Sequence, residues 1–237
     1  PSGNSELTGE IILRIRLPRI ILAAMVGSAL ALSGTVYQGL FRNPMADPYV
    51  IGASSGASLG ATVAMMLPLQ GELWGLSTVP LFAFAGSLMV VFIVFKLART
   101  DQQRTSMTHL ILAGVAVSSV LSAVVSLLMC LMPQQGLQGL VFWLMGGFSA
   151  RGWSHVTALA PHCAIGFAIV LMHTKHLNAL LLGEEEAMGL GVDVDKTTRR
   201  LVIAASLLTA ASVAAGGIIA FAGLVVPHVV RLLVGPD

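Results

Sequence analysis

The sequence predicts an all-α, polytopic membrane protein. Of its 237 residues, 56% are hydrophobic and only 10% are charged, whereas a soluble domain carries about 25% charged residues. Several uncharged runs approach or exceed the roughly 20 residues with which a helix crosses the hydrocarbon core. The alternation of apolar and polar residues that marks a membrane barrel is absent. Helices are therefore the economical fold, because lipid offers no partner to unpaired backbone groups.

The first predicted span follows a basic segment. Residues 20–40 carry no charge, and Pro18 stands just before them, where a helix start tolerates a proline. The two prolines of residues 42–48 then predict a tight turn at the membrane surface, because proline lacks the backbone donor and restricts the residue before it. A second span is predicted over 50–67, where glycines at spacing four would let a neighbouring helix of the same subunit approach closely.

Residues 79–97 and 110–132 predict the third and fourth spans, which a basic loop separates. Residues 134–153 are too polar at their start and too interrupted by glycine to cross, so we expect them at the membrane interface, where tryptophan is favoured. The fifth span is predicted over 156–172, with a kink near Pro161.

The last apolar run is longer than one crossing requires. Residues 201–230 carry no formal charge, and about 20 residues are enough to cross once. A pair of glycines at 216–217 offers a break, which predicts a sixth span before it and a shorter seventh element over 218–233. Pro227 and His228 are expected to interrupt that element.

A polar segment over 183–193 separates the fifth and sixth spans, so it lies in water beside the membrane. Its acidic start suits the positive N-terminal end of a short helix, and Gly191 can end that helix in a left-handed cap. Ala187, Met188 and Leu190 would form a small apolar surface beside the charges. We interpret the segment as a short helix that another protein pushes or pulls; the alternative is a solvated loop with some helix in it.

Lysine and arginine are distributed unequally between the two sides that seven crossings define. The nine on the side of the polar segment are Arg42, Lys96, Arg99, Arg104, Lys175, Lys196, Arg199, Arg200 and Arg231. The four on the other side are Arg14, Arg16, Arg19 and Arg151. Because cytoplasmic loops carry the excess of positive charge, the polar segment is predicted to be cytoplasmic and residue 1 to lie outside. This count assumes that the chain turns at the glycine pair.

Three of the four outside arginines lie between Arg14 and Arg19, against the general bias. One explanation is that long side chains reach the interface from a helix end. The other, which we favour, is a basic docking point for an acidic patch on an extracytoplasmic partner, since arginine holds a carboxylate by two parallel hydrogen bonds.

No catalytic constellation is visible in the sequence. The glycine-rich phosphate loop that ends in Lys and Ser/Thr is missing, so the chain is not expected to hydrolyse ATP. The interiors of the predicted spans lack the charged residues that ion-coupled carriers use at membrane depth. Cys130, Cys163 and His162 lie in apolar runs and are interpreted as core residues, and His228 is interpreted as structural.

Five stretches carry short motifs along almost the whole chain. They are LPR (17–19), GLFRNPMADP leading to GASSGA (39–57), FWLMGGF (142–148), LGE through LG (182–191), and the run 217–231 that contains FAGLVVPH. In these motifs and their order, the chain resembles the FecCD-type permease family, the membrane subunits of ABC importers for iron-siderophores, haem and cobalamin.

The resemblance implies the ten-span fold of an ABC importer permease, of which about seven spans are present as one transmembrane domain over residues 1–237. The first span and about the last two would be missing. A second permease subunit (a homodimer or a paired homologue), two cytoplasmic ATPases and an extracytoplasmic substrate-binding protein are implied as partners, with no nucleic acid. The chain would be a non-enzymatic transport subunit of the bacterial or archaeal cytoplasmic (inner) membrane. It would bind no cofactor, because ATP and Mg bind the partner ATPase.

The resemblance also implies roles for particular residues. The coupling helices, about residues 183–195, would sit in a groove of the ATPase through Gly183, Glu184, Glu185, Glu186, Ala187, Met188, Leu190 and Gly191. Arg16 and Arg19 match the family's outward arginines that meet glutamates of the binding protein. The cytoplasmic gate would comprise Asn43, Pro44, Met45, Ala46, Asp47, Thr105 and Ser106. The implied mechanism is ATP-driven alternating access for an iron-siderophore or a related metal chelate such as haem or cobalamin.

Besides the importer, two other classes of function stay open on the sequence alone: a transport pathway that needs no ATPase, and a structural role. A substrate-gated channel or an ion-coupled secondary transporter would need no ATPase, and co-purification of a nucleotide-binding subunit distinguishes the importer from both. A purely structural membrane subunit is the third possibility, which the polar segment and the gate-like turn disfavour.

Overall fold

The computed structural model describes residues 8–67, 72–73, 76–98 and 107–235. Within these residues the elements are helices, apart from a hairpin of two short strands, β1 (Glu72–Leu73) and β2 (Leu76–Ser77). Five of the described helices are long and apolar enough to cross a membrane. They are the continuous helix Thr8–Leu40, α4 (Thr78–Leu97), α5 (Met107–Leu131), α7 (Trp153–Met172) and α10 (Val194–Gly216). The prediction of an all-α, multi-pass membrane protein is confirmed.

The first helix starts upstream of the proline at which we expected it to begin. Residues Ile12–Arg16 form a π-helical segment, η1, directly before α2 (Leu17–Leu40). Pro18 cannot donate to the carbonyl four residues back. In the π turn before it, the Leu17 N–H bonds instead to the Ile12 carbonyl, five residues back. This shift in pairing lets the helix continue through the proline, so the predicted start is wrong.

The second span is broken rather than continuous. A 3-10 helix, η2 (Pro48–Ile51), is followed by Gly52 at φ +87° and only then by the 14 residues of α3 (Ala53–Met66). A helix of this length rises about 21 Å, less than the roughly 30 Å of the hydrocarbon core. The predicted uninterrupted crossing over 50–67 is therefore wrong, because the left-handed glycine changes the direction of the chain.

Helix α3 packs against α4 through glycines, as the sequence predicted. A Cβ atom on Gly56 would collide with the carbonyl of Gly86, and one on Gly60 would collide with the carbonyl of Phe82. The two backbones therefore approach as closely as small residues allow. The glycine stripe is used inside one subunit.

The middle of the chain follows the prediction more closely. Helices α4 and α5 confirm the third and fourth spans, and α7 confirms the fifth. Helix α6 (Gln134–Leu144) has 11 residues and is too short to cross, as expected for 134–153. A helix that the sequence analysis did not predict, α8 (Thr174–Leu182), follows α7.

The predicted short helix after the fifth span is α9 (Glu184–Gly189). Helix α10 begins soon after it and ends at Gly216, and Gly217 has φ +73°. The predicted break at the glycine pair is confirmed, because the chain leaves the helix there.

The last described helix, α11 (Ala222–Val234), continues through Pro227. The interruption that we expected at this proline is therefore wrong. Proline leaves the Gly223 carbonyl without its donor four residues later. This carbonyl lies against Gly34 of α2, and a side chain at position 34 would collide with it. The carbonyl that the proline leaves free is therefore at the point where α11 packs closely on α2.

Helix α2 lies at the centre of the bundle, where α7, α8, α10 and α11 all contact it. Its buried hydroxyls are paired with α10. Ser33 Oγ lies 2.7 Å from Thr209 Oγ1, and Tyr37 Oη lies 2.8 Å from Ser206 Oγ. Because lipid tails are as apolar as the side chains, helix association in a membrane depends on such hydrogen bonds and on close packing.

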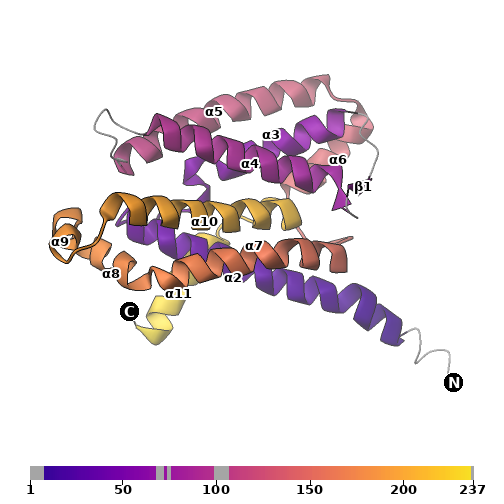
Figure 1. Cartoon of the computed structure of the whole chain (residues 1–237). Coiled ribbons are helices and arrows are strands. Elements are labelled where there is room, and N and C mark those ends of the chain that lie inside the picture. The colour runs from indigo at the N-terminus through magenta and orange to yellow at the C-terminus, as the bar shows by residue number, and fades with distance from the viewer. Residues whose placement is uncertain (1–7, 68–71, 74–75, 99–106, 236–237) are drawn as a thin grey trace.

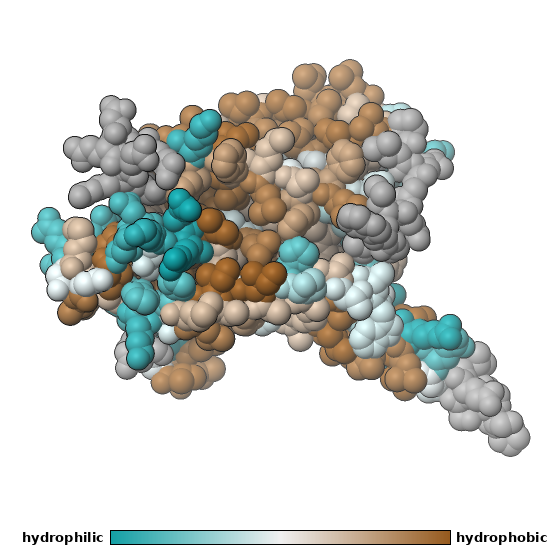
Figure 2. Space-filling view, viewed as in Figure 1, coloured by the Kyte–Doolittle hydropathy of each residue, from teal (hydrophilic) through white to brown (hydrophobic). Residues whose placement is uncertain are grey.

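The two ends of the bundle carry different elements. Helices α8 and α9 lie at one end, whereas the start of the first helix, β1 and α6 lie at the other (Figure 1). Figure 2 shows hydrophobic residues over the middle of the visible face and hydrophilic residues gathered near α8 and α9. This distribution fits helices that cross a bilayer and display polar segments in the water on either side.

Candidate functional site

The predicted coupling segment is part of a projection from one end of the bundle, which we call the knob (residues 174–192; Figure 1). Gly183 is buried, has φ +145° and separates α8 from α9. That φ lies in the region that side chains rarely adopt, so this turn requires glycine. Glu184, Glu185 and Glu186 are exposed in the first turn of α9, at its positive N-terminal end.

Helix α9 ends at a left-handed glycine, as predicted. Gly191 has φ +82° and donates its N–H to the Met188 carbonyl at 2.9 Å, while the Val192 N–H bonds to the Ala187 carbonyl at 3.0 Å. Together these two bonds form a Schellman motif. They satisfy two carbonyls at the end of a six-residue helix and direct the chain toward α10.

The apolar side of α9 is divided between the core and the surface. Ala187 is 0% exposed and belongs to the core cluster that contains Leu180 and Leu201, whereas Met188 and Leu190 are 46% and 66% exposed. The prediction of one outer surface is therefore wrong for Ala187. A short helix must rest on the bundle through one face, and the small alanine occupies that face. Ala187 anchors the knob, and Met188 and Leu190 face solvent.

Side chains around the start of α10 frame the knob. Asp193 accepts the Lys196 N–H at 3.0 Å and pairs with its Nζ at 2.7 Å, and these bonds lower the pKa of the Asp193 carboxyl. Arg200 Nη1 lies 3.4 Å from His173 Nε2, and His173 Nδ1 lies 2.8 Å from the Ile169 carbonyl. Because arginine has no acceptor, His173 accepts through Nε2 and donates through Nδ1. These contacts tie the α7–α8 junction to α10.

The predicted gate turn after α2 is a tight loop held by two of its own side chains. Asn43 Oδ1 accepts the Met45 N–H at 2.9 Å, and Asp47 Oδ1 accepts the Tyr49 N–H at 2.8 Å. Short polar side chains that bond the backbone two residues later stabilise such turns. Burial raises the pKa of the Asp47 carboxyl, and the bond from Tyr49 acts in the opposite direction.

The other predicted gate residues differ in their surroundings. Met45 is 68% exposed, whereas Ala46 is 5% exposed and packs in the same core cluster as Ala187. Thr105 and Ser106 lie outside the described residues. The structure therefore places the turn but not the second part of the predicted gate.

A groove of about 740 Å³ brings the gate turn next to the knob. The exposed Asn43 and Pro44 line it on one side, and Leu177 and Asn178 of α8 line it on another. A Cβ atom on Gly39 would come within 2.9 Å of Leu177 Cδ1, so α8 packs directly on the backbone of α2. A displacement of α8 would therefore also move the end of α2 that leads into the turn.

The predicted docking arginines belong to the first helix, whose start lies at the opposite end from the knob (Figure 1). Arg16 is exposed. Arg19 is partly buried, and its Nε has no partner among the described residues. Arg14 forms an exposed ion pair with Glu10 at 3.2 Å. Arg16 is therefore open to an outside partner, whereas the unpaired Nε of Arg19 is buried.

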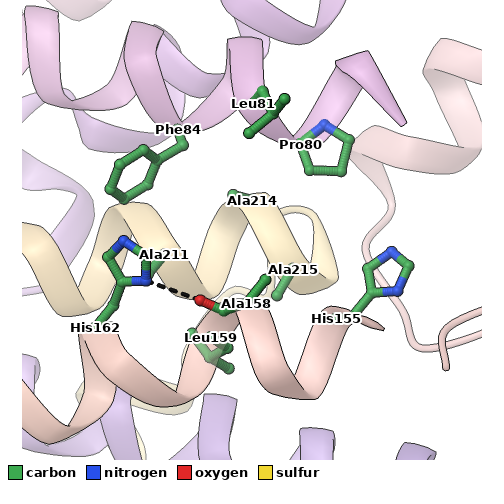
Figure 3. Close-up of a pocket in the computed structure, with 10 residues that line it drawn as sticks. All are labelled: Pro80, Leu81, Phe84, His155, Ala158, Leu159, His162, Ala211, Ala214 and Ala215. Atoms are coloured by element: carbon green, nitrogen blue, oxygen red, sulfur yellow. Dashed lines mark hydrogen bonds between the residues drawn. The ribbon is translucent and has the colours of Figure 1, made fainter. Parts of the chain in front are cut away.

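The interpretation of His162 as a hydrogen-bonded core residue is confirmed. It lines an apolar crevice of about 80 Å³ between α4, α7 and α10 (Figure 3). Its Nδ1 donates to the Ala158 carbonyl at 2.9 Å, and its ring meets that of Phe84 edge-on with centroids 5.0 Å apart. Both interactions are internal to the bundle, so they give His162 a packing role.

Two further interpretations are corrected or refined. Cys163 is buried as expected, but Cys130 is exposed, because most of α5 faces away from the other described helices. His228 is exposed on a continuous helix, so the break that motivated its structural role is absent.

Sequence reasoning missed two features of this arrangement. The first is α8, which Leu177 and Leu180, with the polar Asn178 between them, could have indicated as a short amphipathic helix. The second is a cavity at the end opposite the knob, which Trp143 and Arg151 line together with residues from α3, α4 and α10. No local pattern signals that cavity, because distant parts of the chain form it.

Comparisons with known proteins agree with these observations. The sequence model described as the FecCD transport family matches residues 2–237. The cobalamin import system permease protein BtuC of Halobacterium salinarum is 46% identical over 235 residues, which cover 99% of this chain and 62% of that protein. The hemin transport system permease protein HmuU of Yersinia pestis is 40% identical over 241 residues, which cover 100% of this chain and 70% of that protein.

A solved structure is similar over almost the same extent. It is described as an inward-facing conformation of an ABC transporter assigned to the metal-chelate type. The match has a TM-score of 0.89 at 34% identity and covers 98% of this chain and 72% of the other. This chain thus spans about two thirds of the length of the proteins that it matches.

Proposed function

Because this chain belongs to the FecCD transport family, we propose that it is part of the permease subunit of an ATP-binding-cassette importer. The cargo would be a metal chelate, such as an iron-siderophore, haem or cobalamin, delivered by an extracytoplasmic substrate-binding protein. The subunit itself would perform no chemistry and bind no cofactor. Two cytoplasmic ATPase subunits, which bind ATP and Mg, would supply the energy, and a second permease subunit would complete the pathway as a homodimer.

The observation that carries this proposal is the form of the knob. A six-residue helix with three exposed carboxylates and two exposed apolar side chains is held to the bundle by the buried Ala187. Such a mixture of charge and apolar area suits a groove in a partner protein. The Ala187 anchor means that a force on α9 acts on the bundle rather than on a free loop.

The route from the knob to the pathway would run through α8. Its Leu177 packs on Gly39 of α2, and both helices line the groove beside the gate turn. Closure of the ATPases would move α9 and α8 as a unit and reposition the end of α2 and the turn that contains Asn43 and Asp47. This is a rigid-body transition that small displacements of packed helices can produce.

Binding of the substrate-binding protein would take place at the other end of the bundle. Arg16 and Arg19 would meet carboxylates of that partner, because neither forms an ion pair with a described carboxylate and arginine can hold a carboxylate by two parallel hydrogen bonds. The unequal distribution of Lys and Arg supports this orientation, with the knob inside and the arginines outside.

The competing function is an ion-coupled carrier or a channel. Such a protein would need no ATPase, and its knob would have no partner of fixed stoichiometry. Purification of the full-length protein with its neighbours in mild detergent distinguishes the two. A nucleotide-binding subunit in a constant ratio to the permease favours the importer.

The direct test reverses charge on the knob. In the full-length protein, Glu184→Lys and Glu185→Lys should weaken assembly with the ATPase and lower substrate-stimulated ATP turnover in proteoliposomes. Glu10→Lys is the control for assembly with the ATPase, because that exposed carboxylate lies near the start of the first helix, at the opposite end of the bundle. ATP turnover that is unchanged in both knob variants would remove the coupling role.

A further inference from the structure

The outer end of the bundle contains a cavity of about 570 Å³, well above the crevice of Figure 3 in size. Its walls come from α3, α4, α6, the loop after α6 and the end of α10. Apolar and aromatic side chains such as Phe142 and Met145 dominate the lining, and Arg151 is the one charged residue among the described residues that form it. Pockets for small organic molecules have this size and this combination of apolar walls with a few polar groups.

The loop that carries Arg151 is held in a defined conformation. Gly146 and Gly147 have φ +66° and +150°, and the Gly147 N–H bonds to the Gly216 carbonyl at 2.6 Å, which joins the end of α6 to the end of α10. Ala150, just before Arg151, has φ +59° although it is not a glycine. Left-handed alanine is uncommon and persists only where the surroundings impose it. Arg151 is therefore positioned by tertiary structure.

Two hydrogen-bond donors that line the cavity have no acceptor among the described residues. Trp143 is 7% exposed, and its Nε1 is buried without a partner. The Nε of Arg151 is likewise buried without a partner. Buried donors are almost always paired in folded proteins, so two unpaired donors on residues that line one cavity favour a ligand that carries an acceptor.

The charge of Arg151 is also unbalanced. Its Nη1 lies 3.1 Å from His155 Nε2, and because arginine has no acceptor, the imidazole receives this bond as a neutral ring. No carboxylate among the described side chains pairs with Arg151. Burial lowers the pKa of the Arg151 guanidinium, because the cation has lost water without gaining an anion.

His155 marks the boundary between two spaces of different character. It lines the apolar crevice of Figure 3 at some distance from His162, while its partner Arg151 lines the larger cavity. Pro80 lines both spaces. The apolar crevice offers a ligand little beyond packing contacts. In the larger cavity, the Arg151 guanidinium would select for a ligand that carries a negative charge.

We propose that the outer cavity binds a carboxylate borne on an apolar body, with Arg151 as the cationic partner and Trp143 as a second donor. This inference rests on the proposed function, because the carboxylate would come from one of the two molecules that the importer receives at this end. The carboxylate belongs either to the cargo or to an acidic side chain of the binding protein. A carboxylate would supply the acceptors that the two donors lack and neutralise the buried cation.

The test compares haemin with haemin dimethyl ester, which has the same apolar macrocycle but no free carboxylate. Equilibrium binding to the full-length permease in detergent is followed by haemin absorbance, without ATPase or binding protein. The wild-type protein should bind haemin about tenfold more tightly than the ester, the effect of one charge-assisted interaction. Arg151→Gln should abolish that preference, and Arg151→Lys should restore part of it, since a lysine keeps the charge but not the planar fork.

Lys96→Gln is the matched control, because Lys96 is exposed in the last turn of α4, at the other end of that helix from Val79 and Pro80, which line the cavity. A second measurement, the association of ligand-free binding protein with each variant, separates the two sources of the carboxylate. Loss of the haemin preference in Arg151→Gln assigns the carboxylate to the cargo. A weaker association of the ligand-free binding protein, with the haemin preference unchanged, assigns it to that partner.

The proposal is overturned if Arg151→Gln changes neither measurement while the variant retains the thermal stability of the wild type. Neither measurement requires transport. An absence of ATP-dependent uptake by the wild-type complex would therefore refute the proposed function without deciding the role of the cavity.

Discussion

Arg231 donates a 2.7 Å hydrogen bond from Nη1 to Oε1 of Gln38. The contact joins α11 to the central helix α2, and Gln38 is only 3% exposed. The other end of the same amide is also used, because Gln38 Nε2 donates to the Leu224 carbonyl at 3.3 Å. One buried glutamine therefore links two helices through both halves of its side chain, and it lines the groove beside the gate turn.

Replacing this glutamine should loosen the pair of helices. Gln38→Leu leaves the Arg231 guanidinium and the Leu224 carbonyl without their partner, and a lost bond to a charged group costs about 1.5–3 kcal/mol. We expect a lower midpoint of unfolding in detergent. Gln38→Glu keeps an acceptor for Arg231 and serves as the control. If the Leu variant unfolds at the wild-type midpoint, the bond makes no net contribution to stability.

Close packing of α3 on α4 predicts opposite effects for two glycine substitutions. Gly56→Ala would place a Cβ atom against the Gly86 carbonyl, and such overpacking costs about 1–3 kcal/mol. Gly27→Ala has no atom within 4 Å of the new Cβ, so the gain in helix propensity, up to about 1 kcal/mol, should remain. Thermal unfolding of both variants in the same detergent measures the difference. Equal stability would contradict the tight crossing.

The anchor of the knob predicts a position-dependent response to charge. Ala187→Asp would bury a carboxylate among apolar side chains, at a cost of about 3–5 kcal/mol if it stays unpaired. Detachment of α9 should relieve that cost. We therefore expect faster hydrogen exchange of the α9 amides and loss of ATPase coupling. Met188→Asp, at an exposed position of the same helix, should leave the exchange rates unchanged.

The same pair of variants provides the outcome that would reject the anchor. If α9 amides exchange at the wild-type rate in Ala187→Asp, the helix is held by something other than its buried face.

Charge reversal at the outer end predicts a salt-dependent loss of partner binding. Arg16→Glu and Arg19→Glu should slow association with the substrate-binding protein, because the attraction between the two surfaces becomes repulsion. The difference from wild type should be largest at low ionic strength and shrink toward 1 M salt, where charges are screened beyond about 3 Å. Surface plasmon resonance over a salt series measures it. Identical rates for wild type and variants at low salt would exclude these arginines from docking.

Much of the helical framework was predictable from local sequence. Spans three, four and five appear close to their expected limits, and span six ends where expected but begins earlier, at Val194. A run of about 20 apolar residues has few alternatives in lipid. The cap at Gly191 and the break at Gly217 were also predictable, since positive φ at a helix end favours glycine. These features depend on a few neighbouring residues and need no knowledge of the rest of the chain.

The errors arose where packing overrides local pattern. Pro18 and Pro227 were expected to begin or interrupt helices, yet both helices continue, one through a π turn and the other beside the backbone of Gly34. Ala187 was assigned to the surface because it neighbours charged residues, but the orientation of α9 on the bundle buries it. The course of these helices and the burial of Ala187 cannot be predicted from composition, because each depends on which other helix packs against the segment.

The sequence by itself determined that this chain is a multi-pass helical membrane protein with a polar segment between its fifth and sixth spans. Hydropathy and the residues that form turns act over short stretches of the chain, so their effects can be predicted from the linear sequence. Only the tertiary structure decided that α8 connects the knob to the gate turn and that Arg151 and Trp143 share a cavity with α3, α4 and α10. Those relationships join residues far apart in the chain, and such contacts exist only once the helices have packed.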